Sequence, residues 1–372
     1  MSKLPPAQSG IVLVGPTHPY SGGIAQHTTR LALELERAGH IVTVESWSSQ
    51  YPSFLYQGSG RVHADEPEVG VPSTVINELA WYSPLSWWRA GRRSRGASAL
   101  VLTVPTPFHF LPYFLLLLAV GRRPLRVAIV HNVHPHERFV GDSFLMSRLL
   151  RLFDRVVVHN DESAKAVRAL APEVEDLRVA SLPSPWSVGS TTKPPSTPQS
   201  ASIQLLFFGT IRAYKGLGVL IDALETLDNC SLTVAGEFWE DPQQYLAQIS
   251  TRGVDDRVII RAGYVKAQEF ESIFSAADIL VLPYLSATGS IVRELGFDFG
   301  LPVIATNVGS LAEGIVDGKN GFIVEPGDSA KLADAIKQSS TPKKLAALRR
   351  GARALQADRS QLWSDYVTAI VS

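Results

Sequence analysis

The stretch from Leu282 to Asp328 constrains the fold of this chain more than any other part of the sequence. It begins at the end of an apolar run, Ile279 to Leu282, which predicts a buried strand closed by Pro283. A loop of small residues from Ser286 to Ser290 follows, and then residues 291–299 with the apolar spacing of a helix. A strand, a loop and a helix in this order direct free backbone N–H groups towards one point, which suits an anion such as a diphosphate.

The same arrangement is repeated further along this stretch. Pro302 to Thr306 predicts a second buried strand, and a loop containing Gly309 follows it. A turn from Asp317 to Gly321 precedes a third apolar run, Phe322 to Val324. The spacing predicts half of a parallel α/β domain with a phosphate-sized ligand at its strand ends. The alternative is that the glycines serve only turns.

The composition describes a globular chain that is long enough for two domains. It has 372 residues, of which 45% are hydrophobic and 19% charged. The formal net charge is zero, so the whole chain gives no argument for a nucleic-acid partner. Its single cysteine, Cys230, excludes an internal disulfide and most zinc sites. The apolar runs Ile11 to Val14 and Leu111 to Val120 are too short for a signal peptide and a bilayer span, which predicts a cytoplasmic protein.

The first half of the chain opens with the pattern of a Rossmann-like sheet. Ile11 to Gly15 predicts a buried strand, Ile24 to Ala38 an amphipathic helix and Ile41 to Val44 the next strand. Gly22 and Gly23 lie in the loop before this helix, where they let the backbone approach a ligand. This pair is weaker evidence than the dinucleotide fingerprint G-x-G-x-x-G, which the sequence lacks.

Two cations mark the loop that opens the second half. Ile203 to Phe208 predicts a strand, and Gly209 to Gly216 then carries Arg212 and Lys215 directly before the predicted helix Leu217 to Leu227. Either cation alone is more often a solvated surface charge. Together at a helix N-terminus they can hold a diphosphate by charge-assisted hydrogen bonds added to the backbone dipole.

A cluster of histidines follows another predicted strand. Val127 to Val130 is directly followed by a segment that contains His131, His134, His136 and Glu137. Polar residues at the carboxyl end of a parallel strand are where α/β proteins place their chemistry. A metal site is the alternative use of these side chains. They lie on a proline-containing segment without the i, i+4 helical spacing of zinc enzymes, so no metal is predicted.

The segment from Trp81 to Arg155 is both basic and aromatic. It contains eleven arginines but only three acidic residues, which gives a local formal charge of +8. Eight aromatic side chains lie between Trp81 and Phe114. Aromatic and basic residues together suit a membrane interface with anionic lipid, which predicts peripheral contact at the inner face of the plasma membrane. The alternative is that Leu111 to Val120 is simply a core helix of the domain.

Three separated motifs resemble those of retaining glycosyltransferases of family 4, among the bacterial group 1 glycosyltransferases, which have the GT-B fold. Residues 299–328 read FGLPVIATNVGSLAEGIVDGKNGFIVEPGD and match that family's pattern almost continuously. Residues 208–217 read FGTIRAYKGL and match a second motif on the donor side. Residues 19–44 read PYSGGIAQHTTRLALELERAGHIVTV and resemble the family's first loop and helix. The resemblance therefore covers both halves of the chain.

The resemblance implies an α/β chain of two Rossmann-like domains that face each other across a cleft. The expected acceptor-side domain is residues 1–183, and the expected donor domain is residues 203–356. Residues 184–202 between them are rich in proline, serine and threonine, which predicts a linker. Residues 357–372 are expected to form a helix that crosses back to the first domain.

The resemblance also implies roles for individual residues. His131 is expected beside the donor sugar, and Arg212 and Lys215 are expected to stabilise the departing diphosphate. The further residues expected to bind the diphosphate or nucleotide are Gly23, Gly209, Gly289, Ser290, Glu294 and Glu313. The residues expected on the acceptor side are Gly22, His134, His136 and Glu137.

The sequence departs from the family pattern at three positions. The family's two glutamates, eight positions apart, fall on Ala287 and Leu295. Its usual arginine falls on Thr210, with Arg212 as the available replacement. The second of these glutamates normally binds the ribose. The carboxylates left for that contact are Glu294 and Glu313.

The predicted reaction is the transfer of a sugar, with retention, from a UDP- or GDP-linked donor to a hydroxyl acceptor. The expected acceptors belong to cell-envelope glycolipid, polysaccharide or related glycan synthesis, lipid-linked acceptors included. No cofactor is expected, and no divalent metal, because the sequence contains no Asp-x-Asp pair. The missing glutamates also favour a second hypothesis, a sugar-nucleotide-binding or scaffold protein that has lost turnover.

Overall fold

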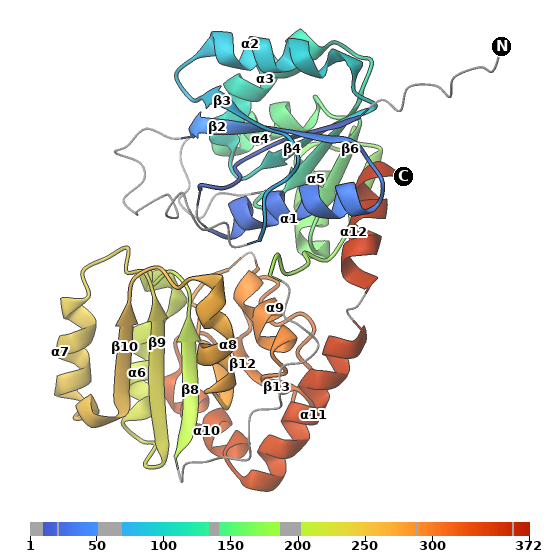
Figure 1. Cartoon of the computed structure of the whole chain (residues 1–372). Helices are drawn as coiled ribbons and strands as arrows, with labels where there is room; N and C mark the ends of the chain where they lie inside the picture. Colours follow the sequence, from blue (N-terminus) through green and yellow to red (C-terminus); the bar gives the residue numbers. More distant parts are fainter. Residues whose placement is uncertain are drawn as a thin grey trace. The chain divides into compact units, whose positions relative to one another are not determined.

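The computed structural model describes residues 10–20, 22–50, 69–133, 141–186, 202–287, 289–358 and 361–372, without the side chains of residues 356–358. It divides into two compact units (Figure 1). The first consists of Met1–Pro185 together with Gln361–Ser372, and the second of Trp186–Ser360. Most of the predicted linker lies outside the described residues.

A seven-stranded parallel sheet in the order β3-β2-β1-β4-β5-β6-β7 forms the first unit. β1 pairs with β2 and β4, so that Ile11 lies opposite Val42 on one side and Ala99 on the other. The strand order therefore reverses between β1 and β4, the switch point where doubly wound sheets bind ligands. The strands are β1 (Ile11–Val14), β2 (Val42–Ser49), β3 (Val75–Ala80), β4 (Ala99–Val104), β5 (Leu125–Val130), β6 (Arg155–Val158) and β7 (Asp176–Val179).

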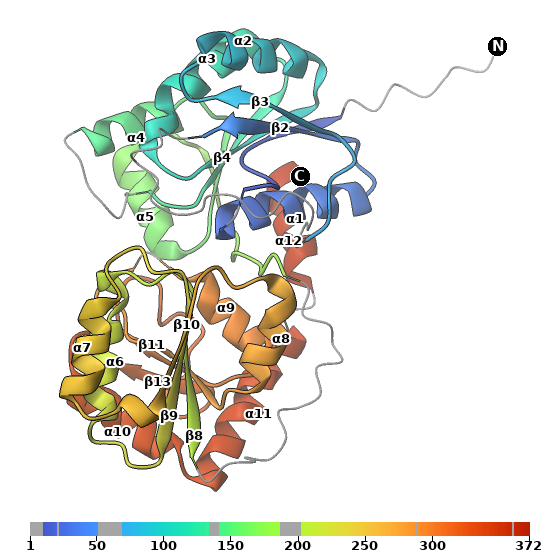
Figure 2. The same cartoon turned by 60° about the vertical axis from the view of Figure 1, so that its left-hand side comes forward.

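Helices cover both faces of this sheet, because its strands carry apolar side chains on both sides. Leu13 of β1 packs with Leu35 on one face, while its neighbour Val14 packs with Tyr113 on the other. The first face carries α1 (Gly23–Arg37) and α12 (Leu362–Val371) (Figures 1 and 2). The second face carries α2 (Pro84–Arg93), α3 (Phe110–Val120), α4 (Asp142–Leu150) and α5 (Asp161–Leu170). Short 3₁₀ turns occupy Ser94–Gly96 and Pro107–His109.

α12 comes from the far end of the chain and completes the first core. Its buried Tyr366 packs with apolar residues of α1 and of the sheet. Arg155 of β6 donates a hydrogen bond of 2.8 Å to the carbonyl of Ile370, and Arg178 of β7 one of 3.2 Å to the carbonyl of Ala369. Cations at a helix carboxyl end satisfy its unpaired carbonyls and favour its dipole, so this end of α12 is held in place.

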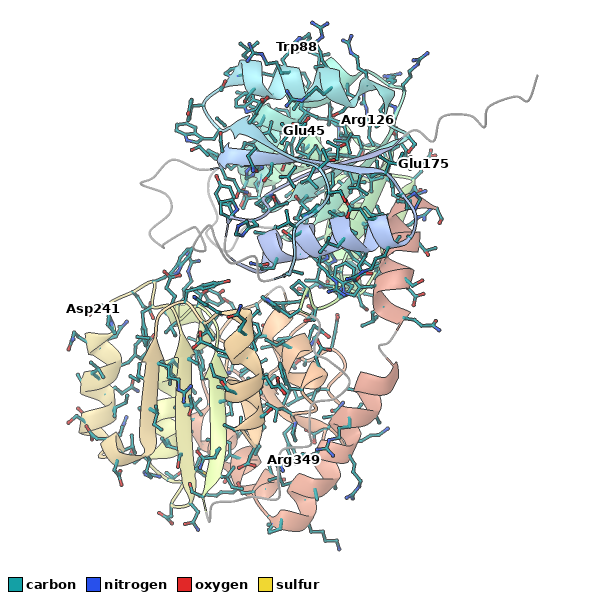
Figure 3. The ribbon with its side chains drawn as sticks, viewed as in Figure 1. Glu45, Trp88, Arg126, Glu175, Asp241 and Arg349 are labelled. Carbon is teal, nitrogen blue, oxygen red and sulfur yellow. The ribbon has the colours of Figure 1, made fainter. Side chains whose placement is uncertain are left out.

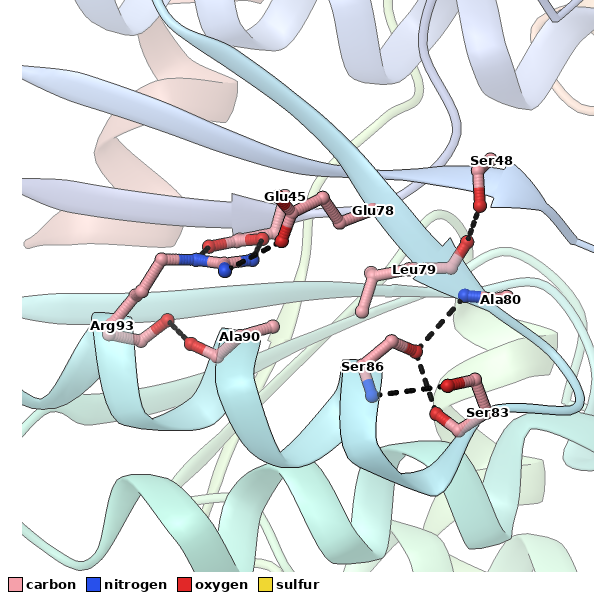
Figure 4. A network of polar contacts seen from close by, with 10 residues as sticks. Glu45, Ser48, Glu78, Leu79, Ala80, Ser83, Ser86, Ala90 and Arg93 are labelled. Carbon is pink, nitrogen blue, oxygen red and sulfur yellow. Dashed lines mark hydrogen bonds and ion pairs between the residues drawn. The ribbon is translucent and has the colours of Figure 1, made fainter.

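A polar network holds α2 against the edge of the sheet (Figure 4). Arg93 of α2 makes two hydrogen bonds of 2.7 Å with Glu45 of β2 and one of 2.8 Å with Glu78 of β3. The Glu45 side chain is only 1% exposed, so the guanidinium compensates a buried charge. Near the start of α2, the Ser86 hydroxyl accepts a hydrogen bond of 3.2 Å from the amide of Ala80. Both ends of α2 are therefore fixed, and with them the orientation of its outward face.

A six-stranded parallel sheet in the order β10-β9-β8-β11-β12-β13 forms the second unit. β8 pairs with β9 and β11, so that Leu205 lies opposite Leu232 and Ile279. This order has its switch point between β8 and β11. The strands are β8 (Ile203–Phe208), β9 (Cys230–Gly236), β10 (Val258–Ala262), β11 (Ile279–Leu282), β12 (Val303–Thr306) and β13 (Gly321–Val324).

Two apolar clusters cover the faces of the second sheet. One face carries α6 (Leu217–Leu224), α7 (Gln243–Thr251) and α10 (Ser329–Ser339), and the other carries α8 (Ala267–Ser275) and α9 (Ile291–Asp298). α11 (Pro342–Asp358) contributes Leu348 to the first cluster and Ala352 to the second. Its Arg349, labelled in Figure 3, makes a buried ion pair with Asp278 just before β11. Short 3₁₀ turns occupy Ala213–Lys215 (η4) and Asp255–Arg257 (η5).

The predicted α/β architecture of two Rossmann-like domains is confirmed by these two doubly wound sheets. The strands Ile203–Phe208 and Ile279–Leu282 have the predicted bounds. The sequence also has a strand-like run from Val179 to Leu182, but a strand there is wrong, because β7 ends at Val179 opposite the last residue of β6. Among the helices of the described ranges, none combines the length and apolar character that crossing a bilayer requires.

Candidate functional site

The loops at the switch point of the second sheet pack directly against each other. The loop after β8 begins at Gly209, and the loop after β11 begins at Pro283. The amide of Leu285 donates a hydrogen bond of 2.7 Å to the carbonyl of Tyr214. A Cβ atom on Gly216, whose φ is +70°, would lie 2.0 Å from the carbonyl oxygen of Pro283. The sequence therefore needs glycine at 216 to bring these two loops together.

Lys215 is buried at this junction. It ends η4, is 8% exposed, and its Nζ atom lies 5.5 Å from the centre of the Tyr284 ring. A Cβ atom on Gly209 would lie 3.3 Å from the same Nζ atom, so the loop backbone borders the amine. Burial, and then the nearby charge of Arg212, lower the pKa of Lys215 to about 8. No carboxylate of the described residues forms an ion pair with this amine, so the site has an uncompensated positive charge that an anionic ligand can neutralise.

Arg212 is held beside Lys215 by an aromatic partner. Its guanidinium lies 4.2 Å from the centre of the Trp239 ring, a cation–π distance. The Trp239 indole donates a hydrogen bond of 3.2 Å to Glu237, the residue after β9. The amide of Ile211 also bonds the carbonyl of Glu237 at 2.8 Å, which ties the Arg212 loop to the carboxyl end of β9. The structure therefore brings the two predicted cations together at the carboxyl ends of β8 and β9.

The amino end of α9 lies on the other side of Gly209. A Cβ atom on Gly209 would come within 3.4 Å of Val292 in the first turn of α9. Ser290 caps the helix by accepting a hydrogen bond of 3.3 Å from the Val292 amide, and its hydroxyl lies 3.4 Å from that of Tyr284. Gly289 is exposed directly before this cap. The positive end of α9 therefore adds to the field of Lys215.

The carboxylates predicted to bind ribose lie on α9 and on the loop after β12. Glu294 in the first turn of α9 pairs with its neighbour Arg293 at 2.9 Å. Arg293 also donates to the carbonyl of Leu311 at 3.1 Å, which joins α9 to the loop containing the exposed Glu313. Leu295, at the position that corresponds to the second glutamate of the family pattern, is 1% exposed and packs in the core of the second unit.

The first unit has its own cluster of functional candidates at the carboxyl ends of β5 and β6. His131 follows β5, and its ring centroid lies 4.9 Å from that of His159, which follows β6, and 5.2 Å from that of His27 on α1. Burial lowers the pKa of all three rings, for His159 to about 4, so they are neutral at neutral pH. Gly22, the residue before α1, has a φ of +99°, which favours glycine. Gly23 is half-buried as the first residue of that helix.

Sequence reasoning missed several of these side chains. Tyr284 could have been noted because it follows the predicted strand Ile279 to Leu282 closely. Trp239 could have been noted because it follows the strand-like run Leu232 to Gly236. His27 and His159 carried no local signal, since nothing in the sequence connects them to His131. The predicted acceptor-side residues His134, His136 and Glu137 lie outside the described residues. Within the described ranges, no three histidine, cysteine or acidic side chains form a group that could hold a metal ion.

The two doubly wound sheets, with the cations Arg212 and Lys215 at the switch point of the second, can be compared with known structures. The whole fold is similar to that of HepE from Anabaena solved with UDP, with a TM-score of 0.74 at 16% identity, over 96% of this chain and 98% of that one. It is also similar to the sucrose-phosphate synthase of Thermosynechococcus elongatus, with a TM-score of 0.69 at 17% identity, over 97% and 100% of the two chains. The chain therefore has the GT-B fold.

The family model described as "Glycosyl transferases group 1" matches residues 202–341. The match confirms that residues 202–341 resemble the group 1 glycosyl transferases, as the sequence motifs of this part of the chain predict. The chain is 28% identical over 236 residues to the D-inositol 3-phosphate glycosyltransferase of Pseudarthrobacter chlorophenolicus, which covers 59% of this chain and 52% of that protein. It is 30% identical over 173 residues to the glycogen synthase of Mycobacterium tuberculosis, covering 45% of this chain and 40% of that protein. The matches thus span about half of these curated relatives or less.

Proposed function

We propose that this protein transfers a sugar from a nucleoside diphosphate to a hydroxyl acceptor. The observation that carries the proposal is Lys215, a buried amine without a carboxylate partner among the described residues, at the switch point of the second sheet. A diphosphate supplies the negative charge that this amine lacks. HepE, which shares the fold, has been solved with UDP and with UDP-glucose, and this supports a UDP-linked or the chemically similar GDP-linked donor.

The chemistry proposed for this site is electrostatic. As the bond from sugar to diphosphate breaks, negative charge grows on the leaving phosphate. Lys215, Arg212 and the backbone amides around Gly289 and Ser290 are the fixed positive groups that would stabilise it. The leaving phosphate would help to deprotonate the acceptor, and the sugar would be transferred with retention, as in family 4. No divalent metal is required in this mechanism.

The remaining predicted residues have roles in binding. Glu294 and Glu313 are proposed to bind the ribose, and Gly209 lets the diphosphate approach the loop after β8. His131 is proposed to bind the donor sugar, with Gly23 beside it and Gly22 on the acceptor side. The same division assigns the acceptor to the first unit and the donor to the second.

The outward faces of α2 and α3 support a membrane-linked acceptor. α3 buries Tyr113 and Leu116 against the sheet but exposes Leu111, Phe114 and Leu118 by 54%, 38% and 59%. One side of α3 is therefore part of the core, as the core-helix alternative predicts. The other side of α3 is an exposed apolar stripe. On α2, Trp88 is 38% exposed beside arginines 89 and 92, and it points outward in Figure 3. We propose that this face contacts anionic lipid at the inner face of the plasma membrane, where a lipid-linked acceptor in envelope glycan synthesis would be reached.

One experiment separates this function from that of a binding or scaffold protein without turnover. Calorimetric titration with UDP- and GDP-sugars is combined with an assay of donor hydrolysis and transfer. Binding of one donor together with turnover supports the transferase. Binding without turnover over a panel of hydroxyl acceptors supports the scaffold instead, and absence of binding contradicts both.

A further inference from the structure

Five aromatic rings meet at the carboxyl edge of the first sheet. We name them the histidine cluster: His27, His131, His159, Trp363 and Tyr366. His27 is central, with ring centroids 5.2 Å from His131, 5.1 Å from Tyr366 and 5.4 Å from Trp363, on which it stacks. The rings come from α1, from the ends of β5 and β6, and from α12. All of these elements belong to the first unit, so the folding of that unit alone assembles the cluster.

The cluster concentrates buried polar atoms that have no hydrogen-bond partner within the part of the chain that the structure describes. They are Nδ1 and Nε2 of His27, Nε2 of His131, Nε2 of His159 and the hydroxyl of Tyr366. Buried polar atoms in folded proteins are nearly always paired, and each exception calls for an explanation. Five such atoms on four neighbouring rings indicate a shared network, which small ring rotations or one bound water would complete.

This network has a defined direction, because an atom that can only accept lies at one end. The carbonyl oxygen of Ala180 lies 3.4 Å from Nδ1 of His159. Nδ1 must therefore carry the proton in that contact. In a neutral ring this leaves Nε2 of His159 unprotonated, so that it can only accept a hydrogen bond. The neighbouring ring, at 4.9 Å between centroids, is His131, which buries its own Nε2 in the cluster. An N–H on that nitrogen is the donor that His159 lacks.

We propose that His27, His159 and Tyr366 are positioning residues that hold His131 as its Nε2–H tautomer. In this tautomer Nδ1 is unprotonated and acts as a hydrogen-bond acceptor. The role of that acceptor, to receive a hydroxyl of the donor sugar, rests on the proposed function. The tautomer itself rests on the cluster alone. Because a neutral imidazole offers one donor and one acceptor, fixing Nε2–H decides that His131 accepts from its ligand.

Two further features keep the ring of His131 in one state. Burial, reinforced by repulsion from the other histidines of the cluster, lowers the pKa of His131, so the ring stays neutral and retains an acceptor nitrogen. α12 then closes the cluster, because the Trp363 indole donates a hydrogen bond of 3.0 Å to the carbonyl of Ser184 while its ring stacks on His27. A substitution on α12 is therefore expected to shift the ring of His27 and, through it, the ring of His131.

The test is ¹⁵N NMR of the full-length protein with labelled histidine, where long-range nitrogen–proton couplings report the tautomer of each ring. His131→Ala identifies the His131 signals. The wild type is expected to show His131 as a single Nε2–H tautomer. His159→Phe keeps a ring of similar size but removes the acceptor, so His131 is expected to become a mixture of tautomers. The kcat is expected to fall about tenfold or more, with a smaller change in KM, since orientation rather than binding is lost.

Two variants control for packing. His109→Phe makes the same substitution at another buried histidine of this unit, between Trp47 and Tyr113, and is expected to leave the His131 signals unchanged. His159→Gln retains an acceptor in its amide oxygen and is expected to restore the single tautomer. Tyr366→Phe removes only one hydroxyl and is expected to perturb the His27 and His131 signals.

Either of two results overturns the inference: an Nδ1–H tautomer of His131 in the wild type, or unchanged His131 signals in both His159→Phe and Tyr366→Phe. A changed tautomer with unchanged turnover supports the positioning network and contradicts the proposed role of His131 in transfer. Because the NMR signature does not depend on activity, failure of the proposed function and failure of this inference give different results.

Discussion

Arg155 of β6 donates a hydrogen bond of 2.8 Å to the carbonyl of Ile370, a residue 215 positions later in the chain. The Arg155 side chain is 7% exposed and also pairs with Asp176 of β7 at 2.7 Å. One guanidinium therefore joins two neighbouring strands to the last turn of α12, where helix carbonyls lack partners of their own. This contact keeps α12, and with it Trp363 and Tyr366, against the rest of the first unit.

We expect Arg155→Met to lower the free energy of unfolding by about 1.5–3 kcal/mol, the range for losing buried hydrogen bonds to a charged group. Amide exchange in α12 should accelerate more than exchange in α1. The control is Arg151→Met, because Arg151 pairs with Glu173 at 2.8 Å with both side chains more than 40% exposed. That surface pair should contribute less than about 1 kcal/mol. Equal destabilisation by the two variants would contradict the role assigned to Arg155.

Lys215→Ala and Arg212→Ala should each reduce kcat by about 10²-fold or more, because each removes a charge placed to stabilise the leaving diphosphate. Steady-state kinetics with the donor that binds measures the effect, with circular dichroism to confirm folding. Lys331→Ala is the control, since that lysine is 61% exposed on α10 in the same unit and pairs with Asp328 at the surface. Near-normal turnover by both folded variants would remove the assignment of the donor site.

The activity should depend on the charge of Lys215. Burial lowers the pKa of this amine to about 8, so in the free enzyme it is charged below that pH and neutral above it. Because only the charged form attracts a diphosphate, kcat/KM should be highest below pH 8 and fall as the pH rises through this value.

Arg212 provides a check on this pH profile. Its charge contributes to the low pKa of Lys215, so Arg212→Ala should move the falling limb to higher pH even though it lowers the maximum. Lys215→Arg keeps the charge at all accessible pH values and should abolish the limb. If kcat/KM falls at the same pH in both variants, the titrating group is not Lys215.

Vesicle co-sedimentation should require anionic lipid and weaken as salt is raised, because exposed charges are screened over about 8–10 Å. Leu118→Glu in the exposed stripe of α3 should reduce the bound fraction. Leu246→Glu is a matched control, as Leu246 is a 44% exposed leucine on α7 of the other unit. Equal partitioning with neutral and anionic vesicles, or none with either, would leave α3 as an ordinary core helix.

Transfer should continue in excess EDTA. The sequence has no Asp-x-Asp pair to hold a cation against the diphosphate, and Lys215, Arg212 and the amino end of α9 supply positive charge instead. The assay is repeated with added Mg²⁺, Mn²⁺ or Zn²⁺. Activity that EDTA abolishes and a single metal restores would overturn both the prediction and this account of the leaving group.

The sequence alone determined the architecture and the position of the two cations that we propose bind the donor. Ile279–Leu282 is apolar at every position, as a strand covered on both faces must be, and its closing proline marks where the loop begins. Arg212 and Lys215 could be assigned to one anion site because both lie in the few residues before a helix. Such inferences succeed because strand burial, helix start and loop chemistry depend mainly on residues close in sequence.

Only the tertiary structure decided which polar side chains meet and how they are charged. His27 and His159 join His131 because α1 and the ends of two adjacent strands share one edge of a sheet. Leu295 is buried where the family has a glutamate, and Lys215 has a lowered pKa because loops from two strands exclude water from it. The physical reason is that burial and proximity arise from packing between elements distant in the chain, and the energy of a buried charge depends on every atom that replaces its water.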